Sequence, residues 1–381
     1  MTDRARTLYT DLGAVPVINA LGPRTMLGGS SPSPTVLAEM EVAGRYYVDR
    51  DQLLAGSGRV VADMLGCEAA LVTPGCAAAL LMGTVACVAG ADPEAMGRLP
   101  DTTGLPSQVI IQAPQRYKYD RVIRMAGVQL VEAGTARGCT RADVEAVLTH
   151  DTAAVLYPVL GGEPRGILSL EEMVDVAHAA GVPVIADAAY QIYPLDNFRR
   201  TASAADLVGF GGKYFGGPNS SGLLCGRRDL VEAALAHSFA AFERREVPGY
   251  GRPLKIDRQE VIGVLAALRE WLDETIHVQR EADASRRGRR LRDLLTGLPG
   301  VQMSPSDGDR VTTLRLTLSA AATLSAAELA TRLQAGNPSI WSDSGADAGE
   351  PGAAVTFHLQ LVEDGDVEVI GARVRELLAR V

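Results

Sequence analysis

Two polar residues end consecutive apolar segments in the middle of the chain. The segment Val182–Ala186 reads as a buried strand and leads into Asp187. The segment Asp206–Phe210 reads as another strand and runs through two glycines into Lys213. Because parallel strands end at one edge of a sheet, we expect this carboxylate and this amine to lie close together. A lysine can form a Schiff base with an aldehyde, and a carboxylate can keep a pyridine nitrogen protonated. The pair therefore predicts a site for pyridoxal phosphate.

The segment Ala69–Gly90 adds a phosphate-binding signal upstream. An apolar strand is broken at Pro74, and an alanine-rich helix follows. The N–H groups at a helix start attract anions, and the small residues Gly75, Cys76 and Ala77 would let a phosphate approach the backbone. Each signal alone has a plainer interpretation, as a helix cap, a solvated turn or an ordinary buried βα unit. Their occurrence together, in this order, carries the prediction.

The composition narrows the class of protein. The chain has 381 residues, of which 47% are hydrophobic, which suits a large α/β domain with a smaller one. Its net charge of −9 argues against a nucleic-acid surface. The basic run Arg286–Arg292 lies on a predicted helix and indicates a solvated or salt-bridged face. Five cysteines and five histidines are scattered, so no metal site is predicted. No apolar run is long enough to span a membrane, and we expect a soluble, cytoplasmic protein.

Strands and helices alternate from about Ser57, which predicts a mostly parallel sheet with helices on both faces. A glycine- and serine-rich arm precedes this region, and a long helical pattern follows it. The expected division is an N-terminal arm (1–50), a large domain that binds the cofactor (51–258), a linking helix (259–295) and a small C-terminal α/β domain (296–381).

Several longer motifs identify a family. The chain resembles the fold-type I pyridoxal-phosphate enzymes, specifically the selenocysteine-synthase-like branch and its D-glucosaminate-6-phosphate ammonia-lyase-like proteins. The likeness covers nearly the whole chain. It implies a large, mostly parallel sheet of the seven-stranded type, a small C-terminal α/β domain, and a homodimer or a larger assembly of dimers. The motifs are V-I-N-A-L-G (Val17–Gly22), L-P-D-T-T-G (Leu99–Gly104), Y-D-R-V-I-R-M-A-G (Tyr119–Gly127), D-A-A-Y-Q-I-Y-P (Asp187–Pro194), G-G-K-Y-F-G-G-P-N-S-S-G (Gly211–Gly222) and G-R-P-L-K (Gly251–Lys255).

The resemblance also implies roles for single residues. Lys213 would bind the cofactor aldehyde and move protons at Cα, while Asp187 would pair with the pyridine nitrogen. The phosphate would be held at the helix start, with one glycine of the lysine loop nearby. The residues at the phosphate would be Gly75, Cys76, Ala77 and Gly212. Gln191 or Tyr190 would reach the ring hydroxyl. Arg252 and Lys255 would bind a phosphate or carboxylate, which they could reach across a dimer interface.

Three positions depart from the family pattern. Gln115 stands where a histidine usually stacks on the ring, so stacking is weakened or taken over by Tyr117. Phe210 replaces a phosphate-binding serine. The stretch Asn337–Ser344 lacks the arginine that often follows it. These positions normally tune the cofactor and recognise the substrate, so they leave the exact reaction open.

The leading prediction is a lyase that removes the Cα proton of a polar amino acid or amino-sugar acid, expels a β-hydroxyl and releases ammonia. A racemase or epimerase is an alternative that would need a second base, for which Tyr190, Tyr117 and Arg24 are candidates. An aminotransferase is another, and a non-catalytic protein on the same fold is a third. The expected partner is a small anionic substrate, with no nucleic acid and no membrane. Selenium transfer is disfavoured by the acidic balance and the lack of a tRNA-binding extension.

Overall fold

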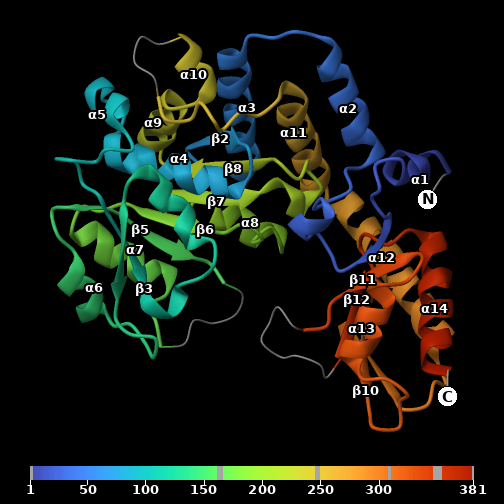
Figure 1. The fold of residues 1–381 in the computed structure, drawn as a ribbon. Helices are drawn as coiled ribbons and strands as arrows, with labels where there is room; N and C mark the ends of the chain where they lie inside the picture. Colours follow the sequence, from blue (N-terminus) through green and yellow to red (C-terminus); the bar gives the residue numbers. More distant parts are fainter. Residues whose placement is uncertain (1–2, 161–165, 245–248, 308–309, 346–353, 380–381) are drawn as a thin grey trace. The chain divides into compact units, whose positions relative to one another are not determined.

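The computed structural model describes residues 3–160, 166–244, 249–307, 310–345 and 354–379 (Figure 1). The chain divides into two compact units. The sheet unit is Ser31–Leu272, and the small unit combines Met1–Ser30 with Asp273–Val381. The first part of the expected N-terminal arm thus clusters with the C-terminal segment, whereas residues 31–50 cluster with the large sheet.

The sheet unit contains a seven-stranded sheet in the order β2-β8-β7-β6-β5-β3-β4. β8 runs antiparallel to both of its neighbours, and the other neighbouring strands pair in parallel. This confirms the predicted fold class, a mostly parallel seven-stranded α/β sheet. The strands are β2 (Ala69–Thr73), β3 (Gln108–Gln112), β4 (Gln129–Ala133), β5 (Thr152–Pro158), β6 (Val184–Asp187), β7 (Leu207–Gly211) and β8 (Gly222–Gly226).

Side chains alternate between the two faces of this sheet, as the period of a strand requires. On β7, Val208 and Phe210 belong to a core formed with α3 (Arg50–Leu65), α8 (Leu195–Thr201) and α11 (Arg258–Leu272). Leu207 on the opposite face packs into a second core with α4 (Cys76–Ala89). Both faces are therefore covered, and Phe210, which replaces the expected phosphate-binding serine, is a core residue. The other helices of this unit are α2 (Pro34–Arg45), α5 (Pro93–Arg98), α6 (Arg141–Val147), α7 (Leu170–Ala179), α9 (Arg228–Ala236) and α10 (Phe239–Arg244), with 3-10 turns η2 (Ala113–Gln115), η3 (Asp120–Ala126) and η4 (Gly212–Phe215).

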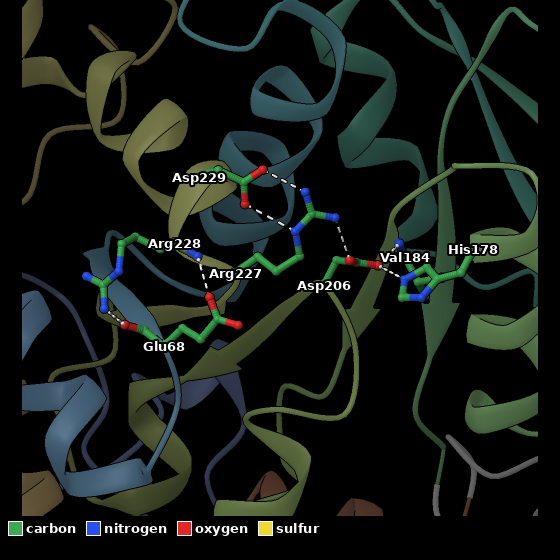
Figure 2. Close-up of polar contacts among 7 residues, drawn as sticks. All are labelled: Glu68, His178, Val184, Asp206, Arg227, Arg228 and Asp229. Carbon is green, nitrogen blue, oxygen red and sulfur yellow. Dashed lines mark hydrogen bonds and ion pairs between the residues drawn. The ribbon is translucent and has the colours of Figure 1, made fainter.

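An ionic cluster around the buried Asp206 side chain ties the sheet together at the edge where β6 and β7 begin (Figure 2). The Asp206 side chain accepts from the Val184 backbone N–H (2.8 Å) and hydrogen-bonds Nε2 of His178 (2.8 Å). Arg227, which follows β8, donates to the same carboxylate at 2.9 Å and also pairs with Asp229 at 2.6 Å. One carboxylate thus joins α7, β6, β7 and the start of α9. We call these four side chains, His178, Asp206, Arg227 and Asp229, the clamp.

The small unit contains two sheets. Strands β9 (Val301–Asp307), β10 (Arg310–Leu318) and β12 (Ala354–His358) form an antiparallel sheet in the order β12-β10-β9. Strand β1 (Val17–Ala20) pairs in parallel with β11 (Ser339–Ser342). Helices with buried apolar faces complete the core. They are α12 (Glu274–Leu295), α13 (Ala326–Gln334) and α14 (Asp364–Ala379), accompanied by α1 (Asp3–Thr10) and η1 (Thr25–Leu27).

The basic run on α12 is salt-bridged, which is one of the two arrangements expected of it. Arg286 and Arg287 both pair with Asp364, and Arg290 pairs with Glu368. These acidic partners lie on α14, so the arginines bind one helix of the small unit to another.

The segment expected to be one linking helix consists of two helices. α11 ends at Leu272, and α12 begins at Glu274. Asp273 separates them because its side chain accepts from the backbone N–H groups of Thr275 and Ile276, which is an N-cap. The first helix belongs to the sheet unit and the second to the small unit.

None of the described helices is both long and apolar enough to cross a membrane. No three histidine, cysteine or acidic side chains in the described part of the chain are grouped as metal ligands would be.

Candidate active site

The strand register brings three functional segments to one edge of the large sheet. Gly222 on β8 lies opposite Thr73 of β2 and opposite Gly211 of β7. The start of α4 and the turn η4 therefore leave the sheet on the same side. β6 ends there too, since Asp187 pairs in register with Gly209 of β7. This is the carboxyl edge of the parallel strands, where open α/β sheets bind their ligands.

Asp187 lies at the centre of this edge and accepts hydrogen bonds on both carboxylate oxygens. Its Oδ1 accepts from the Cys76 thiol (3.4 Å) and from the Ala189 backbone N–H (3.2 Å). Its Oδ2 accepts from the Tyr117 hydroxyl. Alternation along β6 puts Asp187 on the same face as Ile185, which packs with α4, and this explains why the first residue of α4 reaches it.

Both side-chain donors to Asp187 hold their protons firmly. Burial raises the pKa of the Cys76 thiol well above its ordinary value, and the Asp187 carboxylate adds to the rise. Burial also raises the pKa of the Tyr117 hydroxyl far above its usual range, again with help from the charge of Asp187. Ionising either side chain would place a second negative charge beside Asp187. The thiol and the hydroxyl therefore both remain neutral donors.

Lys213 belongs to the same group of residues. It lies in η4, and its Nζ is 4.9 Å from the centre of the Tyr214 ring. The Lys213 charge opposes the rise in the pKa of Cys76, which means that the ammonium acts on the thiol that contacts Asp187. The structure thus brings together the three segments that sequence reasoning selected.

Glycines permit the close approach of these segments. A Cβ on Gly222 would lie 2.5 Å from the carbonyl carbon of Gly75, and a Cβ on Gly212 would lie 2.2 Å from Oγ of Ser221. The backbones of β8, η4 and the α4 start therefore pack directly on one another. The Gly212 N–H donates to the Ser221 carbonyl (2.8 Å), so its contribution to this edge is close packing.

The start of α4 is open in front of its backbone. Gly75 has a φ of +96°, which favours glycine, and a Cβ there would meet no atom within 4 Å. Ala77 is exposed, and a 14-residue helix offers its first N–H groups and the positive end of its dipole to an anion. An anion cradle, a carboxylate and an amine on one edge fit the phosphate, ring nitrogen and aldehyde of pyridoxal phosphate.

Two predicted contacts to the cofactor have other partners in the structure. The Gln115 side chain donates to the Pro158 carbonyl (2.9 Å) and accepts from Gln112 (3.0 Å), and it is 3% exposed. Gln115 therefore braces the core, whereas the Tyr117 hydroxyl reaches this edge and donates to Asp187. The Gln191 amide donates to the Val159 carbonyl (3.1 Å).

The other candidates lie on the protein surface or in the other unit. Tyr190 is 46% exposed, with its ring edge-on to Tyr214. Arg252 pairs with Glu243 of its own chain at 2.7 Å, and Lys255 is exposed. Arg24 belongs to the small unit, where it forms an ion pair with Asp343 at 3.7 Å.

Sequence reasoning missed the contacts that Cys76 and Tyr117 make with Asp187. The alternation along β6 could have indicated the first, because it turns Asp187 toward α4. No sequence pattern indicates the contact of Tyr117, because Tyr117 follows β3 whereas Asp187 ends β6.

Known proteins resemble the chain over most of its length. A "5'-C-glycyluridine monooxygenase-decarboxylase" of Streptomyces sp is 34% identical over 87% of this chain and 83% of its own. A "D-glucosaminate-6-phosphate ammonia lyase" of Salmonella typhimurium is 30% identical over 69% of this chain and 70% of its own. The solved structure of D-glucosaminate-6-phosphate ammonia-lyase superposes with a TM-score of 0.83 at 26% identity, covering 98% of this chain and 99% of the other.

The fold and the edge that carries Asp187 and Lys213 define an enzyme of the pyridoxal-phosphate-dependent fold type I, which confirms the predicted class and cofactor. Residues 8–282 match the family described as L-seryl-tRNA selenium transferase (SelA). The chain belongs to this family. The predicted resemblance to its ammonia-lyase-like members is confirmed, and the monooxygenase-decarboxylase is a relative that sequence reasoning did not foresee.

Proposed function

We propose that the protein is a lyase that eliminates a β-hydroxyl from a small anionic amino acid and releases ammonia, with amino-sugar acids as the preferred substrate class. The observation that carries the proposal is the meeting of Asp187, Cys76 and Lys213 at one edge of the sheet. The reaction type is supported by the two similar proteins named as D-glucosaminate-6-phosphate ammonia-lyases.

The chain's own residues divide the work of holding the cofactor. Cys76 and Ala77, at the open start of α4, bind the phosphate through helix-start N–H groups. Asp187 accepts a hydrogen bond from the ring nitrogen and balances its positive charge. Lys213 supplies the covalent attachment through Nζ. Once bound, pyridoxal phosphate stores the electron pair that remains at Cα after a proton leaves.

Lys213 then acts as the base. Its Nζ would take the Cα proton of the substrate, and the β-hydroxyl would leave with a proton as water. One water molecule adds to the product and ammonia departs, so the balance is one hydroxy-amino acid converted to one 2-oxo acid and one ammonia. No oxidant or reductant is required.

The geometry favours one-base chemistry over racemisation, which needs a second base on the opposite side of Cα. The Tyr117 hydroxyl donates to Asp187, and its raised pKa makes it a poor base. Tyr190 is 46% exposed and rests against another ring. Elimination and transamination need only the amine of Lys213, and they differ in whether ammonia is released.

A second candidate function is oxidative decarboxylation of an amino acid. Its support is the Streptomyces monooxygenase-decarboxylase, which is 34% identical over 87% of this chain. Such a reaction would consume dioxygen and release carbon dioxide from the substrate carboxylate. The same Asp187 and Lys213 would serve it, so the site residues do not separate it from elimination.

The surface cations Arg252 and Lys255 are proposed to attract the anionic group of the substrate. Their loop supports this, because Gly251 and Leu254 line a small cavity together with Pro74, one residue before the α4 cradle. The ion pair of Arg252 with Glu243 is half exposed and therefore weak, so an anionic ligand could replace it. A homodimer would let these cations serve either subunit.

One assay separates the candidate functions. The purified enzyme, loaded with pyridoxal phosphate, is offered hydroxy-amino acids and amino-sugar acids, with and without a phosphate group, in air and under argon. Elimination predicts equal yields of ammonia and 2-oxo acid under argon, with the Lys213→Ala variant at least ~10³-fold slower.

The other outcomes each point elsewhere. A requirement for air with release of carbon dioxide would replace elimination by oxidative decarboxylation. Exchange of the Cα hydrogen with deuterated water, without ammonia, would indicate racemisation. Full activity of Lys213→Ala would remove this lysine from the mechanism.

A further inference from the structure

Two side chains that the proposed reaction leaves without a role converge on the Asp187 carboxylate. The Tyr117 hydroxyl donates to Oδ2, and the Cys76 thiol donates to Oδ1 at 3.4 Å. They come from separate elements, since Tyr117 follows β3 and Cys76 is the first residue of α4. The Ala189 N–H adds a third donor to Oδ1 at 3.2 Å. Both oxygens of the carboxylate therefore accept hydrogen bonds from the protein itself.

The structure also fixes Tyr117 itself. The Tyr117 backbone N–H donates to Oδ2 of Asp120 at 3.1 Å, and Asp120 is 4% exposed. Arg116 donates to the same carboxylate oxygen and pairs with Glu132 as well. This chain of contacts anchors the loop that carries the hydroxyl.

The donors suit a carboxylate. A carboxylate accepts on about four lone-pair sites, so an O–H, an S–H and an N–H can all be aimed at it at once. Because both donors stay protonated, their grip does not weaken across the physiological pH range. A lone pair of Oδ2 remains for a further donor.

We infer that Tyr117 and Cys76 are positioning residues, which hold the Asp187 carboxylate in one orientation so that the ring nitrogen of the cofactor meets an aligned acceptor. The inference rests on the proposed role of Asp187. Tyr117 contributes more than Cys76 to the orientation of the carboxylate, because a hydroxyl is a stronger donor than a thiol. Neither residue needs to touch the substrate.

The test measures affinity for pyridoxal phosphate itself, by titrating cofactor-free protein and following absorbance, with no substrate present. Tyr117→Phe removes only the hydroxyl and should raise the Kd about tenfold, which is about 1.4 kcal/mol. Tyr119→Phe is the matched control: its ring lies edge-on to Tyr117 at 6.0 Å, it is 56% exposed, and its Kd should not change. Cys76→Ala should raise the Kd by about threefold, and Cys76→Ser, which restores a donor, should reverse that loss.

A double-mutant cycle decides whether Tyr117 acts through Asp187. In an Asp187→Asn background, the Tyr117→Phe change should alter the Kd less than twofold, because its target charge is gone. The pH at which the absorbance of the bound cofactor titrates should shift in Tyr117→Phe and stay unchanged in Tyr119→Phe. A residue that only packs would not move this signal.

Three results would overturn the inference. Tighter binding by Tyr117→Phe would mean that the hydroxyl competes with the cofactor for Oδ2. Additive losses in the cycle would mean that Tyr117 acts elsewhere. If Tyr117→Phe does not fold, failure of Cys76→Ser to recover the affinity lost in Cys76→Ala would decide against it. Because no turnover is measured, these results stand apart from whether the enzyme is a lyase.

Discussion

Two aspartates on neighbouring strands of one sheet have opposite surroundings. Asp187 ends β6 at the carboxyl edge, where a hydroxyl, a thiol and a backbone N–H, all uncharged, donate to it. Asp206 precedes β7 at the other edge, where Arg227 and His178 grip it and its side chain is 1% exposed. The charge of Asp206 is met by the Arg227 guanidinium of its own chain. The donors at Asp187 orient a charge without cancelling it, which leaves it able to attract a cationic ligand group.

The difference teaches how burial and partners sort one residue type into two tasks. A buried carboxylate that binds an arginine, an imidazole and a backbone N–H holds several elements together. Removing its charge weakens the hydrogen bonds that join those elements. A carboxylate surrounded by neutral donors at the open end of a parallel sheet is oriented for use. Substitution of Asp187 should therefore lower activity, whereas substitution of Asp206 should lower stability.

The largest expected effect is on turnover at the carboxyl edge. Asp187→Asn should lower kcat by ~10²–10³-fold, because an amide cannot balance the positive ring nitrogen, a loss comparable to removing one electrostatic group from an active site. The free energy of unfolding of the cofactor-free protein should change by less than about 1 kcal/mol, since asparagine still accepts hydrogen bonds. Steady-state kinetics and urea unfolding of the same preparation check both halves. An unchanged kcat with lower stability would make Asp187 a second structural aspartate.

The next effect is on stability at the clamp. Asp206→Asn should lower the free energy of unfolding of the sheet unit by about 2 kcal/mol, because the single amide oxygen cannot replace both carboxylate oxygens, one of which accepts from Arg227 while the other contacts the Val184 N–H and His178 (Figure 2). Unfolding is followed by Trp271 fluorescence in a Trp341→Phe background. Trp271 reports on the sheet unit, since it lies on α11 and donates to the Ile192 carbonyl.

Asp229→Asn provides the matched control for the clamp. It removes a carboxylate from the same arginine, but this one is 64% exposed, so the cost should be about 0.5 kcal/mol. Equal costs at the two positions would show that burial does not set the importance of Asp206. Activity per folded molecule should stay unchanged in both variants.

The sequence predicted the part of the site that depends on local pattern. Apolar segments that end in Asp187 and Lys213 became β6 and β7, and the alanine-rich helix became α4, each within two residues of the predicted bounds. Such strands are buried on both faces, so hydrophobic runs mark them clearly. The strand register then brings their ends together without further information.

Contacts between distant segments could not be predicted in this way. The parallel pairing of β1 with β11 joins segments from opposite ends of the chain, and neither has a pattern that indicates its partner. Gln115 follows a predicted strand, as an active-site residue would, yet its amide turns to core partners. The end of α11 was a missed local signal, because Asp273 before Glu274 is a recognisable helix start.

The smallest expected effect is the acid dependence of the clamp. Burial alone would raise the pKa of the Asp206 carboxyl, but the Val184 N–H, His178 and Arg227 outweigh it, and the pKa is lowered. The unfolded chain therefore binds a proton at this carboxyl more readily than the folded chain does. Its contribution to stability is complete above about pH 4, the ordinary range of an aspartate, and is lost as pH falls through the lower folded value.

The measurement is the difference in free energy of unfolding between wild type and Asp206→Asn, followed by Trp271 fluorescence from pH 6 to pH 2.5. Taking the difference removes the contribution of other carboxylates with lowered pKa values, such as Asp229 and Asp364. Cys87 also senses Asp206, but burial raises its pKa to about 12, so the thiol stays neutral throughout. The difference should be constant above about pH 4 and shrink below it, by about 1.4 kcal/mol for each unit by which the folded pKa is lowered. A difference that stays constant down to pH 2.5 would mean that the shape of the Asp206 side chain, and not its charge, holds the clamp together.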